Sequence, residues 1–362
     1  MNNAHFEHGG NNAAVAHELG CQAWDFLDAS ASLSPWILSG SLLRRVNARA
    51  WRDYPDPACT NLRNLIAACH GLAADHVIAG NGAAELFTWA ARDAAALGVS
   101  VVHSPGFADH LRALRCWSAA IRPAELPLHF SASPQQFPPD LPAGDVLWIT
   151  NPHNPTGQLW SRASLEPLLH CFDLVICDEA FLPLVPDGEM HSLIPLLKFS
   201  SNLVVIRSLT KLYGMAGLRL GYALAQPERL HRWAVWRDPW PVNGIAVAVG
   251  EQLLVKPSTY QRWCRKVQGW TAAEGAWWLQ GLAKLPGITA MPSAANYLLM
   301  EGRGSLVPLR QALAANHHIL LRDCRSFEGL GERWLRLGYQ SHRNNRRILA
   351  ALRRELSAEA LA

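Results

Sequence analysis

Five short apolar runs recur in the first 206 residues of the chain, with helical stretches between them, and this alternation limits the folds available. Each run is rich in Val, Ile or Leu and is too short for a typical helix. Runs of this kind are typical of strands that are buried on both faces. Strands that alternate with helices form a mostly parallel sheet wrapped by helices, so the pattern predicts an α/β fold. The runs span residues 76–79, 99–102, 146–150, 174–177 and 203–206.

Polar, small or aromatic residues follow each run. In a sheet of this kind, ligands bind beyond the carboxyl ends of the strands. We therefore expect one ligand site at this edge, built from segments that lie far apart in the chain. The residues that fall there are Gly82, Phe107, Asn154, Asp178 and Lys211.

The stretch 208–222, which follows the last run, offers the fullest set of reactive groups. Lys211 is flanked by the Ser208 and Thr210 hydroxyls. Two glycines then let the backbone approach a ligand, and Arg219 follows eight residues after the lysine. This set can hold a phosphate beside a reactive amine. Taken alone, the stretch is equally well explained as a surface turn with a solvated lysine.

The turn at 80–86 joins a predicted strand to a predicted helix. After Gly82, the backbone N–H groups of Ala83 and Ala84 open the helix and point, with its dipole, at any bound anion. Glu85 stands where a dinucleotide-binding turn has its third glycine, so the resemblance to that turn is incomplete.

Three other strand ends carry single candidates, each with a plainer alternative. Two Asn-Pro steps within 151–157 make a stiff loop that fixes the Asn154 amide in space. Asp178 and Glu179 place two carboxylates at a strand end, where either can cap the following turn. Phe107 can stack on a planar ligand or belong to the core.

The character of the chain changes near Pro239, where a long helical region, 245–282, begins a second unit. We expect an N-terminal arm at 1–45, a large domain at 46–240 and a smaller α+β domain at 241–362. In the smaller domain, strands are expected at 296–300, 318–322 and 334–338, and a closing helix at 343–361.

Further anion contacts could come from outside the large domain. Arg322 and Arg336 each follow an apolar strand core and can point at one anion, although arginines at a strand rim are as common. His8 lies beside two glycines in the predicted arm. It can approach a ligand, although a histidine near a terminus is usually solvated.

Composition excludes several classes of function. The 362 residues carry 33 basic and 29 acidic side chains, and the basic clusters at 44–45 and 342–347 favour solvated helix faces over a nucleic-acid interface. The eight cysteines form no C-x-x-C pair, so we expect reduced thiols and no metal site. No run approaches the ~20 apolar residues of a membrane span. The first residues lack the pattern of a signal peptide, so a cytoplasmic enzyme is expected.

Pyridoxal 5'-phosphate needs a reactive lysine, a carboxylate and a phosphate cradle at once. Lys211 would form the covalent link to the cofactor, and Asp178 would pair with its pyridinium nitrogen. Asn154 would donate to its phenolate oxygen. The residues expected to bind the cofactor are Gly82, Ala83, Ala84, Phe107, Asn154, Asp178, Ser208, Thr210, Lys211 and Arg219.

The motifs at 80–85, 151–157, 178–180 and 208–221 together resemble the fold-type I pyridoxal-phosphate enzymes of the class I and II aminotransferase group. Within that group, the chain is similar to histidinol-phosphate aminotransferase and to threonine-phosphate decarboxylase of cobalamin synthesis. The segments 8–11, 30–35 and 320–324 look like the decarboxylase.

The resemblance implies an aspartate aminotransferase-like fold and further roles. Tyr54 resembles the tyrosine that reaches the cofactor phosphate of a partner subunit, which implies a homodimer. The positions that would bind a phosphorylated amino acid are His8, Ser32, Arg322 and Arg336. Phe181 departs from the tyrosine of many aminotransferases, and Ser32 and Ser34 replace asparagines expected in the decarboxylase.

The resemblance leaves two reactions open, because the bond held perpendicular to the cofactor plane is the one that breaks. The expected reaction is decarboxylation of O-phospho-L-threonine to (R)-1-amino-2-propanol phosphate. The alternative is an aminotransferase of the histidinol-phosphate type. A non-catalytic ligand-sensing regulator ranks below both, because the 50 or so residues before Tyr54 show no recognition-helix pattern.

Overall fold

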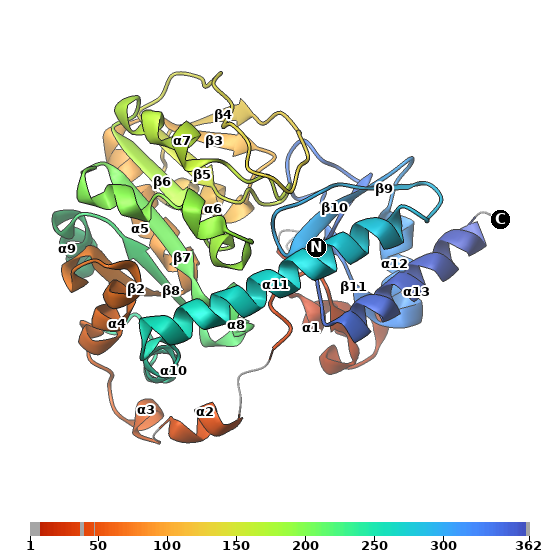
Figure 1. Ribbon diagram of the computed structural model, residues 1–362, viewed down its shortest axis with the longest axis horizontal. Coiled ribbons are helices and arrows are strands. Elements are labelled where there is room, and N and C mark those ends of the chain that lie inside the picture. The colour runs from red at the N-terminus through yellow and green to blue at the C-terminus, as the bar shows by residue number, and fades with distance from the viewer. Residues whose placement is uncertain (1–7, 37–39, 47, 360–362) are drawn as a thin grey trace.

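The computed structural model describes residues 8–36, 40–46 and 48–359 and forms a large and a small α/β unit (Figure 1). The large unit is built on a seven-stranded sheet with the order β2-β8-β7-β6-β5-β3-β4. Only β8 runs antiparallel to its neighbours, so the predicted mostly parallel sheet is confirmed. The strands are β2 (Val77–Asn81), β3 (Ser100–Ser104), β4 (Ile121–Glu125), β5 (Val146–Thr150), β6 (Leu174–Asp178), β7 (Leu203–Ser208) and β8 (Leu220–Leu224).

Both faces of this sheet are covered, which explains why its central strands have no polar face. Every residue of β5, β6, β7 and β8 is buried. The side chains of each strand alternate between two apolar clusters, one packed on α4, α10 and α11 and the other on α5, α6 and α9. These helices are α4 (Thr60–His70), α5 (Gly82–Leu97), α6 (Ala108–Cys116), α9 (Pro227–Trp236), α10 (Gly244–Leu254) and α11 (Pro257–Leu282).

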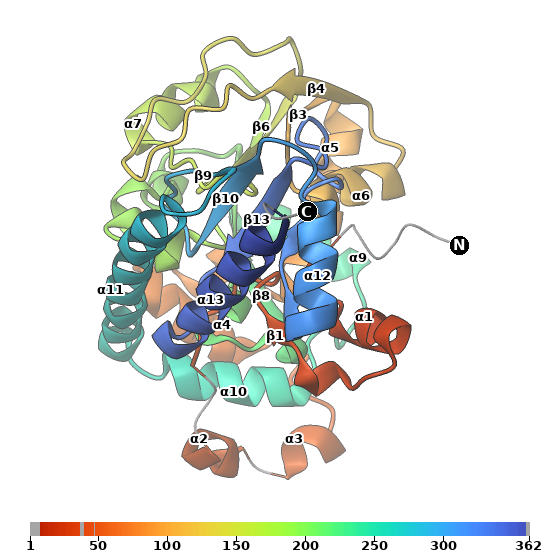
Figure 2. The ribbon, with the colours of Figure 1, turned by 90° about the vertical axis from the view of Figure 1, so that its right-hand side faces the viewer.

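The small unit is an antiparallel sheet with the order β12-β13-β10-β9. Helices α12 and α13 lie in front of this sheet in Figure 2, and α11 crosses from the large unit to it in Figure 1. The elements are β9 (Ile288–Ala290), β10 (Tyr297–Gly302), β12 (Arg322–Asp323), β13 (Trp334–Gly338), α12 (Val307–His317) and α13 (His342–Glu359).

Two elements expected from the sequence are divided in the structure. The strand expected at 318–322 becomes β11 (Ile319–Leu320) and β12, which belong to different sheets. Strand β11 pairs in parallel with β1 (Leu27–Asp28), so the N-terminal segment lies beside the small unit. The helical region 245–282 is interrupted before Pro257, because proline cannot continue a helix but suits the first turn of the next one.

The remaining helices are α1 (Asn12–Leu19), α2 (Gly40–Arg45), α3 (Arg49–Arg52), α7 (Arg162–Leu165) and α8 (Leu209–Tyr213). Helices α2 and α3 project below the body of the molecule in both ribbon views. The predicted division at 45 and 240 stays a prediction. Among the described residues, no helix combines the length and the apolar character that crossing a bilayer demands.

Candidate active site

A cavity of about 430 Å³ lies beyond the carboxyl ends of the parallel strands, between the two units. Most of the side chains expected at this edge line it. The predicted residues found there are His8, Ala83, Ala84, Phe107, Asn154, Asp178, Ser208, Thr210, Lys211, Arg219, Arg322 and Arg336.

Lys211 stands in the short helix α8, directly after β7. Ser208 ends the strand, and its Oγ accepts a hydrogen bond from the Thr210 N–H at 3.2 Å, which caps the helix. The Lys211 amine donates to the Ala31 carbonyl at 3.2 Å. Burial, followed by the positive charges of Arg336 and Arg219, lowers the pKa of Lys211 to about 8. With this pKa, roughly a tenth of the amine is neutral and nucleophilic at pH 7, and about half at pH 8.

Asp178 ends β6 and is held by two donors. The Ala180 N–H donates to its Oδ1 at 2.9 Å, and His110 Nε2 lies 3.1 Å from its Oδ2. His110 stands on α6, where its ring is also packed against Phe87 and Trp148. The carboxylate is thus oriented by a histidine that lies 68 positions earlier in the chain.

The start of α5 forms an anion cradle. No side chain caps this helix at Asn81, and Ala83 and Ala84 of its first turn line the cavity, so backbone N–H groups there are available to an anion. Gly82 has a φ of 73°, and a Cβ atom there would lie 2.5 Å from Arg219 Nη2. Only glycine therefore lets the guanidinium pack against the helix start. Among the described residues, the buried Thr210 Oγ1 has no hydrogen-bond partner. These donors fit a phosphate group.

Arg336, on β13, supplies a buried cation on the opposite side. Its Nη1 donates to Asn154 Oδ1, and its Nη2 donates to the Ser30 carbonyl at 2.9 Å. Burial lowers its pKa, and within the described chain neither a carboxylate at salt-bridge distance nor a hydrogen-bond partner for Nε is found. This arrangement leaves donors for a carboxylate or phosphate ligand.

Arg322 and His8 complete this side of the cavity. Arg322 Nη2 donates to Ser326 Oγ at 2.6 Å. Burial, followed by the nearby charge of Arg336, lowers the pKa of Arg322 to about 10. The ring of His8 meets that of Phe107 edge-on, with centroids 6.2 Å apart. The N-terminal segment therefore closes over the same space as the two arginines.

Another buried arginine, Arg207, lies outside the cavity lining. Arg207 precedes Ser208 on β7, and its Nε donates to Glu179 Oε2 at 2.8 Å. Its Nη1 and Nη2 donate to the two carboxylate oxygens of Glu189 at 2.7 and 3.0 Å. Burial would lower the pKa of Arg207, but the two carboxylates hold it well above its usual value. This network ties together the strand ends that carry Asp178 and Lys211.

Three predicted residues lie outside the cavity lining. Tyr54 is 79% exposed and stacks on Trp240 with ring centroids 4.4 Å apart. Ser32 is buried, and its carbonyl accepts from Asn296 Nδ2 at 3.0 Å. Gly82 stands behind the cradle, against Arg219. None of these positions is tested by a bound ligand, so their roles stay predictions.

Several lining residues were not anticipated as site residues. Ser30 and Ala31 belong to a segment whose resemblance was noted, but no pattern showed that their carbonyls face Arg336 and Lys211. The other unanticipated lining residues are Gly9, Gly10, Phe87, Asp109, Ala180, Phe181, Ala216 and Phe327. No sequence signal marked His110, which contacts Asp178 from outside the lining.

The geometry of a lysine, a carboxylate and an anion cradle around one cavity agrees with the family relationship of the whole chain. The model of the family "Aminotransferase class I and II" matches residues 34–352. The chain belongs to this family. The match includes the large sheet, the small unit and all of the site except the N-terminal segment with His8 and Ser30.

Relatives within the family include both activities suggested by the motifs. Threonine-phosphate decarboxylase of Salmonella typhimurium is 34% identical over 98% of this chain and 98% of its own. Histidinol-phosphate aminotransferase of Symbiobacterium thermophilum is 30% identical over 84% of this chain and 82% of its own.

Solved structures show the same fold. L-threonine-O-3-phosphate decarboxylase from Porphyromonas gingivalis has a TM-score of 0.77 at 24% identity, covering 91% of this chain and 98% of its own. Histidinol-phosphate aminotransferase from Sinorhizobium meliloti, solved with pyridoxal-5'-phosphate, has a TM-score of 0.80 at 20% identity, with coverage of 97% and 95%. The predicted aspartate aminotransferase-like fold and the predicted family are thus confirmed.

Proposed function

We propose that this protein decarboxylates O-phospho-L-threonine to (R)-1-amino-2-propanol phosphate, with pyridoxal 5'-phosphate as cofactor, for cobalamin biosynthesis. The observation that carries the proposal is the pair of buried arginines, Arg322 and Arg336, that face Lys211 across one cavity. An amino acid with a distal phosphate brings two anionic groups, and these two cations supply complementary charge. The decarboxylase relative, which matches 98% of the chain, supports this choice.

The residues present fit the cofactor. The uncapped start of α5, the partnerless Thr210 hydroxyl and Arg219 suit its phosphate. When bound, pyridoxal 5'-phosphate supplies an electron sink for the bond that breaks at the substrate α-carbon. The chain's own contribution is to hold this group and to orient the substrate.

Each polar group around the cavity then has a task. Asp178, oriented by His110 and the Ala180 N–H, would pair with the ring nitrogen of the cofactor. The Lys211 amine, with its lowered pKa, would hold the cofactor and could supply a proton to the substrate α-carbon in place of the CO2 that leaves. Phe107 bounds the cavity as an apolar wall beside His8.

A transaminase remains the second candidate function. It is favoured by the contact between Arg336 and Asn154. Asn154 is expected to lie beside the cofactor, and an arginine held next to it could bind the α-carboxylate of the substrate. Loss of the α-proton, and not of CO2, would follow. The histidinol-phosphate aminotransferase relatives support this alternative.

Products distinguish the two reactions. We expect the purified enzyme, incubated with O-phospho-L-threonine, to release CO2 and an amine without any amino acceptor. K211A should abolish both. Formation of a keto acid that depends on an added amino acceptor would favour the transaminase.

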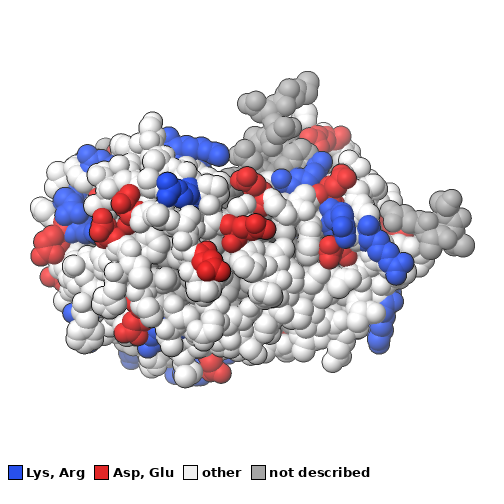
Figure 3. Space-filling model, turned by 90° about the horizontal axis from the view of Figure 1, so that it is seen from above, with Lys and Arg blue, Asp and Glu red and all other residues white. Residues whose placement is uncertain are grey.

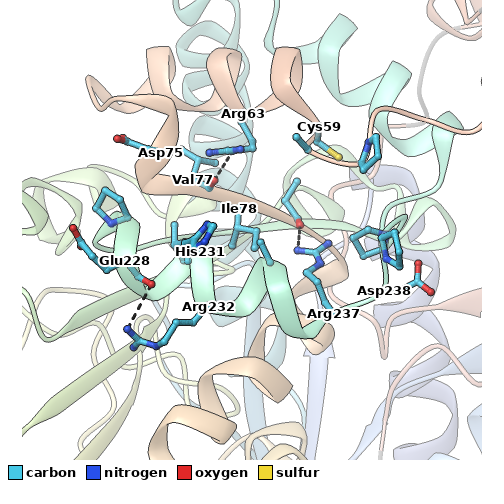
Figure 4. A pocket seen from close by; sticks show the side chains of 18 residues that line it. Cys59, Arg63, Asp75, Val77, Ile78, Glu228, His231, Arg232, Arg237 and Asp238 are labelled. Atoms are coloured by element: carbon cyan, nitrogen blue, oxygen red, sulfur yellow. Dashed lines mark hydrogen bonds between the residues drawn. The ribbon is translucent and has the colours of Figure 1, made fainter.

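We propose further that two copies associate through the face that carries Tyr54. Trp51, Tyr54 and Trp240 are exposed aromatic side chains on one side of the molecule. Next to them lies a groove of about 790 Å³ between α4 and α9 (Figure 4). In it, the side chain of Arg237 is almost fully buried and donates to the Ala79 carbonyl at 2.7 Å. Exposed aromatic groups beside a groove are typical of interfaces.

A second copy on this face would bring Tyr54 to the partner's cofactor site. Sedimentation should give a dimer for the wild type and a smaller species for Trp240→Asp. A monomeric wild type with full activity would contradict the proposal. On the face drawn in Figure 3, basic and acidic side chains are interspersed, so this face gives no support to the regulator alternative, which requires a basic patch.

A further inference from the structure

Ser30 connects three parts of the site that lie far apart in the chain. Its Oγ accepts a hydrogen bond from the Gly10 N–H at 2.9 Å, and its carbonyl accepts one from Arg336 Nη2 at 2.9 Å. The next carbonyl, that of Ala31, accepts from the Lys211 amine at 3.2 Å. Ser30 is 6% exposed and lines the cavity, and the proposed function gives it no role.

Residues 8–11, a short part of the expected N-terminal segment that is called the arm from here on, rest directly on the Ser30 carbonyl. A Cβ atom added at Gly9 would lie 2.4 Å from that oxygen, so only glycine permits this approach. Gly10 has a φ of 84°, in the left-handed region that favours glycine. The seating of His8 in the cavity therefore depends on two glycines in contact with Ser30.

Asp28 fixes Ser30 from the other side. Its Oδ1 accepts from the Ser30 N–H at 2.8 Å and from the Ser30 hydroxyl at 2.5 Å. Because the hydroxyl proton is directed at this carboxylate, the lone pairs of Oγ are available to the arm. Asp28 ends β1, which is paired with β11, so Ser30 is anchored to regular structure.

We infer that Ser30 is a positioning residue that couples the seating of the arm to the orientation of the Arg336 guanidinium. With the arm seated, the Ser30 carbonyl is enclosed by Gly9 and Arg336, and Arg336 keeps Nη2 on that oxygen. When the arm moves away, Gly9 no longer covers the Ser30 carbonyl, and the Arg336 guanidinium is held less firmly on that oxygen. Because such coupling is reciprocal, loss of the Arg336 contact loosens the arm.

The consequence for catalysis rests on the proposed function. A phosphorylated substrate that engages His8 would seat the arm and thereby orient Arg336 for its second anionic group. A substrate without the distal phosphate would lack this contact with His8 and would not reinforce the seating of the arm.

Amide hydrogen exchange of the full-length protein, with and without pyridoxal 5'-phosphate, tests the coupling. S30A removes the acceptor of the Gly10 N–H, so exchange of the peptide that contains residues 8–12 should become roughly five- to tenfold faster. G9A should have at least this effect, because its Cβ cannot occupy the space beside Ser30. R336K should also accelerate exchange in the arm, although its substitution lies more than 300 positions away.

S34A is the matched control. Ser34 belongs to the same buried segment but is anchored to α8, because its N–H donates to the Lys211 carbonyl and its hydroxyl to the Leu212 carbonyl, both at 3.0 Å. Among the described residues, no hydrogen bond joins Ser34 to the arm or to Arg336. Its arm should exchange as in the wild type. Wild-type exchange in R336K, or equal acceleration in S34A and S30A, would overturn the inference. Thermal unfolding of each variant shows whether it is folded, and no turnover is needed, so the result is readable even if the proposed reaction is wrong.

Discussion

Arg207 and Arg336 are both buried, and they stand in opposite electrostatic settings. Arg207 is enclosed by the carboxylates of Glu179 and Glu189, which raise its pKa. Among the described residues, the acceptors of Arg336 are both neutral, Asn154 Oδ1 and the Ser30 carbonyl, and burial lowers its pKa.

The difference separates a structural group from a functional one. A buried charge without a counter-ion destabilises a fold, so such a charge is typical of a functional site. Arg207 is satisfied within the protein and holds two strand ends together. An anionic ligand in the cavity would supply the counter-ion for Arg336.

The largest expected effect is on stability, at Arg207. R207M should lower the free energy of unfolding by about 3–5 kcal/mol, because it leaves the fully buried carboxylate of Glu179 and the partly exposed carboxylate of Glu189 without a cation. Urea denaturation measures this change. R336M, the matched substitution, should cost clearly less, because it removes a charge that has no counter-ion. Equal losses would show that the two settings do not differ.

The next effect is on catalysis, at Arg336. R336M should lower kcat/KM for O-phospho-L-threonine about a hundredfold, which corresponds to the roughly 3 kcal/mol of a charge-assisted hydrogen bond. R336K retains the charge but not the planar fork, and it should recover only part of the loss. Steady-state kinetics at fixed pH give both values. Wild-type kcat/KM in R336M would remove Arg336 from the site.

A smaller effect is expected at the edge of the Arg207 network. Ser192 Oγ donates to Glu179 Oε2 at 2.8 Å and accepts from Arg207 Nη2 at 3.0 Å. S192A should lower the free energy of unfolding by about 1–2 kcal/mol through this lost bridge. The urea midpoint should fall with kcat unchanged. A fall in kcat without any change in stability would show that this network also takes part in the reaction.

The smallest effect is a shift in pH dependence. Loading of cofactor-free protein with pyridoxal 5'-phosphate should accelerate as pH rises through about 8, because the neutral Lys211 amine is the reactive form. The positive charge of Arg336 helps to lower this pKa, so R336M should move the midpoint upward. R207M should move it less, because the positive charges that act most strongly on Lys211 are those of Arg336 and Arg219. Absorbance of the bound cofactor follows the reaction.

The parts of the site that the sequence predicted are those that local pattern controls. Gly82, Asn154, Asp178 and Lys211 each follow an apolar run, so the rule for parallel sheets brings them to one edge. Strand β8 was not expected, because its motif was assigned to ligand contacts and not to an antiparallel strand.

The contacts that escaped prediction join residues far apart in the chain. His110 reaches Asp178 across 68 positions, and Ser30 reaches Arg336 across 306. Such pairs depend on how helices and sheets pack, which periodicity and turn chemistry do not encode. The split of the expected strand at 318–322 has the same origin, since two different sheets compete for its residues.

The pairing of β1 with β11 has a mechanical consequence. It fastens the segment before Ser30 to the strand that leads into Arg322, while β13 carries Arg336 in the adjoining sheet. If the small unit moves away from the large one, the segment that contains Ser30 would move with it. Ser30, Arg322 and Arg336 would then leave the cavity together, while Asp178 and Lys211 would stay with the large sheet.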